Sequence, residues 1–151
     1  MKSDWPDIAG RLTAEGHVLP VRVYFEDTDF SGSVYHASYL RFMERGRSDF
    51  LRALGVGHRA MAAGGEGESL SFAVRRMTID FLRAATIDDL LEVETHVLRI
   101  DGARLALAQR IRRGEELLTE AEVTVVVVNA SGKARRIPKS IAARLAERAA
   151  P

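Results

Sequence analysis

The sequence predicts an α+β domain in which one strand is followed by a long helix and then by four strands of an antiparallel sheet. Three observations lead to this class. Apolar residues alternate in the segment 17–25, recur at steps of three and four between 37 and 54, and alternate again in four segments after residue 69. The 151 residues, 46% of them hydrophobic, suffice for one domain with its own core. We expect this domain to span 17–151, behind a flexible N-terminal arm at 1–16.

The first strand is predicted from the segment HVLPVRVYF at 17–25. Val21, Val23 and Phe25 fall on one face, because successive side chains of a strand point to opposite faces. Pro20 has no N–H to donate to a neighbouring strand, which indicates an edge position or the first turn of the strand.

A helix is predicted from about Ala37 to Leu54, where the apolar residues follow the spacing of one helical face. Gly55 ends it. Gly46 inside the helix costs about 1 kcal/mol relative to alanine, so we expect another element to pack close to the backbone there. The glycine-rich, aperiodic segment 57–69 is expected to be a mobile loop.

Four further strands are predicted at 70–83, 89–100, 103–113 and 116–129. Tight turns at 100–102 and 112–115 should join the last three into an antiparallel meander. The run VTVVVV at 123–128 is apolar on both faces and should lie centrally. Pro138 can open a short C-terminal helix. One long helix cannot cover both faces of such a sheet, so a second copy of the chain is expected on the other face.

Composition excludes several classes of function. Lys and Arg total 22 against 21 Asp and Glu, so the net charge of +1 gives no reason to expect nucleic acid as a partner. The absence of cysteine removes disulfides and thiolate metal sites. No stretch reaches the roughly 18 to 20 apolar residues of a membrane span. The N-terminus lacks the apolar core of a secretory signal, and we expect a cytoplasmic protein.

The segment FEDTDFSGSVYHASYLRF at 25–42 carries the chemistry that the sequence suggests. Asp27, Asp29, Ser31 and Gly32 match the first half of a calcium-binding loop, but the twelfth position is Ser38 rather than a bidentate glutamate. We therefore expect no metal. A plainer interpretation is that the acids stabilise the positive end of the helix that follows.

A third interpretation is a catalytic carboxylate. The first N–H groups of a helix lack intrahelical partners, and they can stabilise the negative charge that develops on a carbonyl oxygen under attack. Gly32 lets the loop fold back, so that an Asp before it and the helix start after it face one substrate atom. This arrangement suits acyl transfer.

The segment 21–51 resembles the signature of the 4-hydroxybenzoyl-CoA thioesterase family of hotdog-fold enzymes, and most closely that of the Tol-Pal-associated acyl-CoA thioesterases. An Asp-Thr-Asp turn, a glycine, a Val-Tyr-His triplet and a Tyr-Leu-x-Phe helix follow in the family's order. The match continues through 72–95, 120–129 and 136–141 and covers about 18–142. It implies a hotdog fold, an antiparallel sheet of about five strands wrapped around one long helix, assembled as a homodimer or homotetramer.

The resemblance implies that the chain is an acyl-CoA thioesterase, hydrolysing a CoA thioester to a carboxylic acid and CoA. The second Asp of the turn, Asp29, is then the nucleophile or general base, and a backbone N–H at or near His36 polarises the carbonyl. The His36 imidazole orients Asp29 or water, or serves only packing. Substrate-binding positions are Gly32, Val34, Tyr35 and Tyr39.

Coenzyme A is part of the substrate, so no separate cofactor is expected. Its phosphates need cations, and Arg75, Arg76 and Lys139 are candidates from local basic clusters, as are Lys133, Arg135 and Arg136. Glu44 lies about 12 Å along the helix from His36, too far to share a site with Asp29 in one chain, and is expected to pair with Arg41 or Arg47.

Two other functions fit the pattern. One is a hotdog hydratase or dehydratase acting on acyl thioesters, which normally pairs an Asp or Glu with a catalytic His. The other is a protein without catalytic activity that binds an acyl carrier protein. Acyl chain length, and CoA against acyl carrier protein as donor, cannot be read from the residues.

Overall fold

A computed structural model describes residues 8–64 and 67–149 of the chain. Six strands form one antiparallel sheet in the order β1-β2-β4-β5-β6-β3. The strands are β1 (Arg11–Leu12), β2 (Gly16–Arg22), β3 (Leu70–Phe81), β4 (Leu90–Asp101), β5 (Arg104–Arg113) and β6 (Glu116–Asn129). The α-helices are α1 (His36–Ala53), α2 (His58–Ala62) and α3 (Lys139–Ala146), and a 3-10 turn η1 covers Phe25–Asp27.

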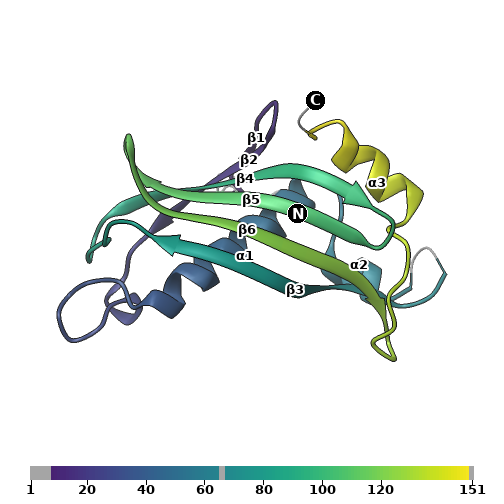
Figure 1. The fold of residues 1–151 in the computed structure, drawn as a ribbon, viewed down its shortest axis with the longest axis horizontal. Helices are drawn as coiled ribbons and strands as arrows, with labels where there is room; N and C mark the ends of the chain where they lie inside the picture. Colours follow the sequence, from purple (N-terminus) through teal and green to yellow (C-terminus); the bar gives the residue numbers. More distant parts are fainter. Residues whose placement is uncertain (1–7, 65–66, 150–151) are drawn as a thin grey trace, which may run out of the picture.

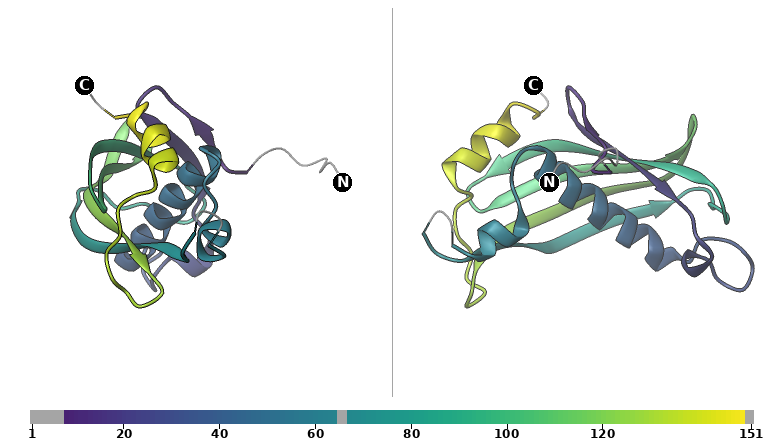
Figure 2. Two further views of the ribbon diagram at one scale, coloured as in Figure 1. Left: turned by 90° about the vertical axis from the view of Figure 1, so that its right-hand side faces the viewer. Right: turned by 180° about the vertical axis from the view of Figure 1, so that it is seen from behind.

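The curved sheet wraps around α1, which lies along its inner face (Figure 1). Seen from behind, α1 crosses in front of the sheet, while α2 and α3 lie near one end of it (Figure 2). The outer face of the sheet carries no helix of the described part of the chain. A sheet wrapped around one long helix is the hotdog fold, so the fold class expected from the sequence is confirmed.

The long elements follow the predicted boundaries closely. The alternating segments after residue 69 form β3 to β6, and β4, β5 and β6 pair in sequence as an antiparallel meander. The helix begins at His36, one residue earlier than expected, and Pro138 caps α3. Strand β6 lies between β5 and β3, and Val123 and Val127 on its inner face are fully buried.

Three local predictions were wrong. Residues 11–12, expected in the flexible arm, form β1 and pair with β2 as a sixth strand; residues 1–7 of the arm lie outside the described residues. The first strand ends at Arg22, and Phe25, expected on the strand face that carries Val21 and Val23, lies in η1 and is 81% exposed. The segment 57–69, expected to be a loop throughout, contains the short helix α2 at 58–62.

Gly46 sets how closely α1 approaches the sheet. A Cβ at this position would lie 2.8 Å from Val93 Cγ1, and 3.2 Å from Thr95 Oγ1. The close packing predicted from a mid-helix glycine is therefore present. Next to it, the buried Gln109 side chain donates to Met43 O and to Thr95 Oγ1, each at 2.9 Å. This polar network fixes the helix on the inner face of β4 and β5.

None of the helices in the described ranges is long and apolar enough to cross a membrane.

Candidate active site

A tight hairpin at 28–34 leads into α1. Thr28 and Val34 form an antiparallel bridge, Asp29 N donates to Ser33 O at 2.8 Å, and Gly32 N donates to Asp29 O at 3.1 Å. Gly32 has φ +86°, in the left-handed region that residues with a Cβ seldom adopt. The glycine therefore allows the chain to reverse within this hairpin, and Asp29 is the residue at which the turn begins.

The carboxylate of Asp29 is held by its own turn. Its Oδ1 accepts hydrogen bonds from Ser31 N at 2.8 Å and from Ser31 Oγ at 2.5 Å. These donors, the hydroxyl first, lower the pKa of Asp29 below its ordinary value. The side chain is exposed in the single chain. The carboxylate is therefore ionised at neutral pH.

The start of α1 lies beside this hairpin. Tyr35 N donates to Asp27 O at 2.9 Å, which ties the helix start to the residue that precedes the hairpin. Tyr35 is the N-cap residue, and no side chain caps the helix there. The N–H groups of His36 and Ala37 are in the first turn and have no intrahelical acceptor. They are available to an acceptor from outside the helix.

The other carboxylates of the segment serve local structure. Asp27 is buried, and its Oδ2 accepts a hydrogen bond from Tyr24 N at 2.8 Å within η1. Glu44 accepts a hydrogen bond from Ser48 at 3.1 Å, and its charge interacts with that of Arg47, one of its two expected partners. The Arg47 guanidinium donates its hydrogen bond to Gln109 Oε1, at 2.9 Å. No group of three or more acids and histidines placed for a metal occurs in residues 8–64 and 67–149.

Aromatic residues surround the helix start on one side. The ring of Tyr35 lies 4.4 Å from that of His36, and Phe81 at the end of β3 packs edge-on against His36 at 6.3 Å. Tyr39 is buried, and its ring lies 5.6 Å from that of Phe81. Val34, the last residue of the hairpin, is buried, and its N–H donates to Ala85 O at 2.9 Å. Four of the predicted site residues, Val34, Tyr35, His36 and Tyr39, therefore lie around the start of α1.

The Tyr39 hydroxyl anchors the segment that supports the hairpin. It accepts a hydrogen bond from Ala85 N at 2.9 Å, in the connection between β3 and β4.

Replacing Tyr39 by Phe leaves this fully buried N–H without an acceptor, so the free energy of unfolding should fall by about 1–3 kcal/mol. Urea denaturation measures the change. The exposed Tyr35→Phe is the matched control and should shift stability by less than about 0.5 kcal/mol; equal effects of the two changes would contradict the anchoring role.

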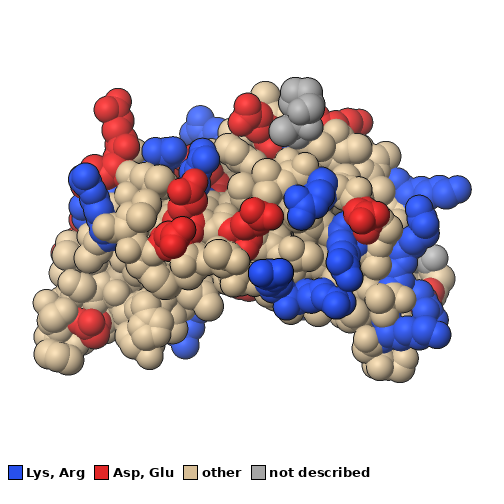
Figure 3. All heavy atoms as spheres, viewed as in Figure 1, with Lys and Arg blue, Asp and Glu red and all other residues tan. Residues whose placement is uncertain are grey.

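Arginines gather on the outer face of the sheet. Arg75 and Arg76 of β3 line a depression of about 360 Å³ together with Arg99 of β4 and Arg104 of β5, with Asp101 as its one acidic lining residue. In the view of Figure 3, basic side chains are concentrated over the half of the molecule away from the hairpin. Lys139, at the start of α3, does not line this depression.

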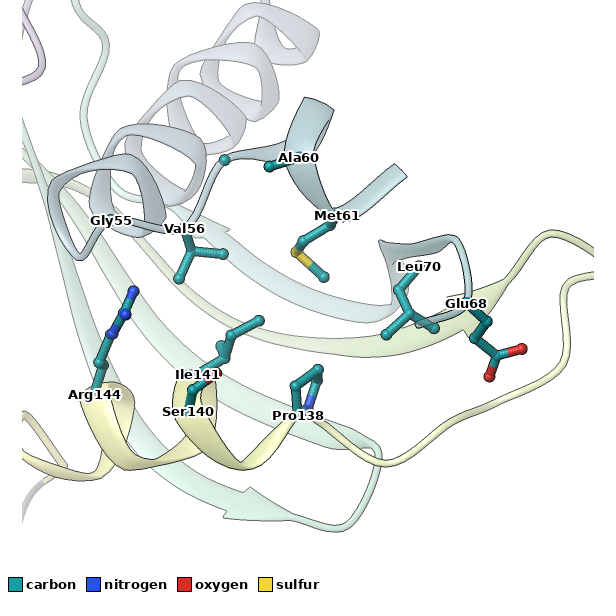
Figure 4. A pocket seen from close by; sticks show the side chains of 11 residues that line it. Gly55, Val56, Ala60, Met61, Glu68, Leu70, Pro138, Ser140, Ile141 and Arg144 are labelled. Atoms are coloured by element: carbon teal, nitrogen blue, oxygen red, sulfur yellow. The ribbon is translucent and has the colours of Figure 1, made fainter. Parts of the chain in front are cut away.

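Two cavities lie on the helix side of the sheet. One, of about 120 Å³, lies between α1, α2 and the strands β3, β5 and β6. We call it the α1–α2 cavity. The other, of about 230 Å³, lies between α2, the start of β3 and α3; Met61, Leu70 and Ile141 point into it, and Arg144 stands at one side (Figure 4). Asp29 lines neither of them.

Sequence reasoning missed Phe81, Ala85, Arg99 and Arg104. Arg99 and Arg104 flank a predicted turn, and the alternation of β4 and β5 could have placed both on the outer face. Phe81 is the last residue of a predicted strand, and nothing in its local pattern shows that it packs against the helix start. The site contribution of Ala85 is a backbone hydrogen bond, which leaves no signal in the sequence.

Residues 23–145 match the thioesterase-like superfamily. The acyl-CoA thioester hydrolase YbgC of Escherichia coli is 46% identical over 126 residues, covering 82% of this chain and 91% of that protein. The acyl-CoA thioesterase YbgC of Haemophilus influenzae is 42% identical over 130 residues, covering 85% and 93%. The crystal structure of a probable thioesterase from Bartonella henselae superposes with a TM-score of 0.80 at 50% identity, covering 82% of this chain and 99% of that one.

Proposed function

The chain belongs to the thioesterase-like superfamily, and we propose that it hydrolyses an acyl-CoA thioester to a free carboxylic acid and CoA. Curated relatives that share more than 40% of their residues with this chain over most of its length carry this activity in their names. The observation that supports the proposal most directly is local. The 28–34 hairpin carries an ionised, exposed carboxylate, and the uncapped helix α1 begins two residues after the hairpin ends.

In the proposed reaction the acyl carbonyl oxygen lies against the N–H groups of His36 and Ala37. Asp29 either takes a proton from a water that attacks the carbonyl carbon or attacks that carbon itself. In both cases one negative charge develops on the carbonyl oxygen, where the helix N–H groups stabilise it. The carbon–sulfur bond then breaks and the sulfur leaves as the CoA thiolate, which takes up a proton. In the second case water hydrolyses the acyl-Asp29 intermediate.

The backbone of His36 contributes more to this proposal than its imidazole. The ring packs between Tyr35 and Phe81, and no ion pair involves it in the described part of the chain. A hydratase or dehydratase would normally pair this His with an Asp or Glu. The packing of the ring therefore favours hydrolysis over that alternative, with His36 and Tyr35 shaping the site.

The arginine depression is the site that we propose for the CoA phosphates. Arg76 lies five residues before Phe81 on β3, about 17 Å along the strand. The pantetheine arm separates the thioester from the diphosphate of CoA by a comparable span. Guanidinium groups bind phosphate oxygens through paired hydrogen bonds, which suits Arg75, Arg76 and their two neighbours.

A homodimer is part of the proposal. Strand β3 is an edge of the sheet, and several large apolar side chains near the hairpin are exposed. They are Tyr24, Phe25, Phe30, Leu82 and Ile87. An apolar surface of this kind and an unpaired strand edge are both features that a second copy would cover.

The pH dependence of hydrolysis should reflect the lowered pKa of Asp29. A group with a lowered pKa keeps its charge to lower pH, so the activity should be complete above about pH 5 and fall as the pH drops through that pKa. Ser31→Ala removes the hydroxyl donor and should move this acid limb to higher pH. Profiles of kcat/KM for both proteins measure the shift, with circular dichroism to exclude acid unfolding. Superimposable acid limbs would contradict the role of Asp29 or of its Ser31 donor.

Thiol release from a panel of acyl-CoA esters tests the proposed function. Short, long and aromatic acyl groups are presented both on CoA and on acyl carrier protein. Release of free thiol together with free acid supports hydrolysis. The rates with CoA esters and with acyl carrier protein esters show which acyl donor the protein prefers. Formation of an enoyl product without acid would support the hydratase class instead. No reaction across the panel would contradict the proposal.

A further inference from the structure

The connection between β3 and β4, residues 82–89, supports the hairpin that carries Asp29. Residues 32–34 of the hairpin run antiparallel to residues 85–87 of this connection. The contacts are Val34 N–H with Ala85 O at 2.9 Å, the bridge between Ser33 and Thr86, and Ile87 N–H with Gly32 O at 3.4 Å. The position of the hairpin, and with it that of Asp29, therefore depends on where this connection lies.

The turn between β5 and β6 holds the β3–β4 connection near both of its ends. Glu116, at the start of β6, accepts a hydrogen bond from Arg83 at 3.2 Å. Arg113, at the end of β5, donates to Asp89 Oδ2 at 2.7 Å and to Ala84 O at 3.3 Å. Arg113 also pairs with Glu116 at 3.3 Å, which joins the two contacts into one network. The hairpin, the connection and the β5–β6 turn all lie at the same end of the sheet (Figure 1).

Asp89 is the residue where this network meets the hairpin contacts. Its Oδ2 accepts hydrogen bonds from Thr86 N at 2.9 Å and from Thr86 Oγ1 at 3.3 Å, besides that from Arg113. Thr86 is the residue that bridges Ser33 of the hairpin. The side chains of Asp89 and Arg113 are 21% and 31% exposed, against 65% for Arg83. Solvent screens the Asp89–Arg113 pair least, so this pair contributes most to holding the connection.

We propose that Asp89 and Arg113 are positioning residues for thioester hydrolysis. Their ion pair fixes the β3–β4 connection, and through it the hairpin, in the place relative to the start of α1 that the reaction of Asp29 requires. The inference rests on the proposed thioesterase function and adds two residues to it. Neither side chain is assigned a contact with the reacting atoms.

Ala85 shows why a small shift of the connection matters for the reaction. Its N–H donates to the Tyr39 hydroxyl of α1 at 2.9 Å, and its carbonyl oxygen accepts the hydrogen bond of Val34 N. One residue therefore joins the helix that supplies the carbonyl-binding N–H groups to the hairpin that supplies the carboxylate. A misplacement of about 1 Å between reacting groups can cost up to about 100-fold in rate.

The first test compares kcat with KM. In Asp89→Asn the amide oxygen can still accept from Thr86 N–H, but the charge that faces Arg113 is lost. We expect kcat to fall by about three- to tenfold and KM to stay within about twofold, because the proposed phosphate site on the outer face is unchanged. Asp88→Asn removes the same charge one residue away and should leave both values within about twofold. Equal kcat values for the two variants would overturn the proposal.

A double-mutant cycle tests whether the two residues act as one unit. Arg113→Met should lower kcat as Asp89→Asn does, and Arg113→Lys, which keeps the cation, should lower it less. The double variant should be no slower than the slower single variant; losses that multiply would overturn the pairing. The matched control is Arg110→Met, which breaks the Arg110–Glu120 pair between the same two strands and should leave kcat within about twofold.

Amide hydrogen exchange tests the positioning without catalysis. In Asp89→Asn the segments 28–34 and 82–89 should exchange about two- to fivefold faster than in wild type, while α1 and β4 keep their rates. Unchanged exchange, or an increase spread over the whole chain, would overturn a local positioning role. A wild-type protein that hydrolyses no thioester would show instead that the proposed function had failed, and the exchange rates would still decide whether the pair holds the hairpin.

Discussion

Replacing Asp29 by Asn should lower kcat for thioester hydrolysis by about 10²- to 10⁴-fold, the range typical for loss of a general base. An amide cannot take a proton from water and is a poor nucleophile. The amide oxygen can still accept the hydrogen bonds that Ser31 N and Ser31 Oγ give to Asp29. The hairpin should therefore keep its shape, and the change isolates the chemistry from the fold.

The matched control for this change is Asp88→Asn. Asp88 is exposed in the connection between β3 and β4 and has φ +71°, a conformation that Asn tolerates well. The Asp88→Asn substitution should leave kcat within about twofold of the wild-type value. Stopped-time assays of thiol release compare the variants, and gel filtration checks their assembly. Turnover by Asp29→Asn close to that of wild type would remove the carboxylate from the mechanism.

Replacing Gly46 by Leu should cause the largest loss of stability, about 1–3 kcal/mol or more. Any Cβ here lies 2.8 Å from Val93 Cγ1, and a larger side chain must also displace the buried hydrogen bonds of Gln109. The helix can only move away from the sheet. Because the first turn of α1 supplies the proposed carbonyl-binding N–H groups, activity should fall together with stability.

Gly46→Ala separates packing from helix propensity. Alanine gains about 1 kcal/mol over glycine in a helix interior, and its single methyl needs only a small shift of the flexible Val93 side chain. Its net effect should therefore be much smaller than that of Leu. Urea denaturation of the two variants measures the difference. If Gly46→Leu were as stable as Gly46→Ala, the helix would not be seated as closely as the structure indicates.

The long elements were predictable because their burial is periodic. α1 and β3 to β6 each keep one side against a common core, and the spacing of their apolar residues records it. Phe25 was wrongly predicted to lie in the first strand because the alternation of apolar residues continues past Arg22, where β2 ends. After Arg22 the chain turns into η1, where Asp27 accepts the hydrogen bond of Tyr24 N. β1 and α2 are too short to develop a period of their own.

The hairpin and the helix start of the candidate site were predictable because they are local in sequence. Asp29, Gly32 and His36 fall within eight residues, and the reversal at Gly32 follows from residue type. The arginine depression and the α1–α2 cavity depend instead on the register of strands far apart in the chain. Arg104 and Arg76 line one depression because β5 pairs with β6 and β6 pairs with β3. A single sequence does not fix that register.

The most direct test of the proposed mechanism is a crystal structure with a non-hydrolysable CoA ester analogue whose carbonyl is retained. We expect the carbonyl oxygen within hydrogen-bond distance of the N–H groups of His36 or Ala37. The Asp29 carboxylate should lie about 3–3.5 Å from the carbonyl carbon, or one water away from it. An analogue bound with its carbonyl remote from the start of α1, and with Asp29 turned towards solvent, would contradict the mechanism.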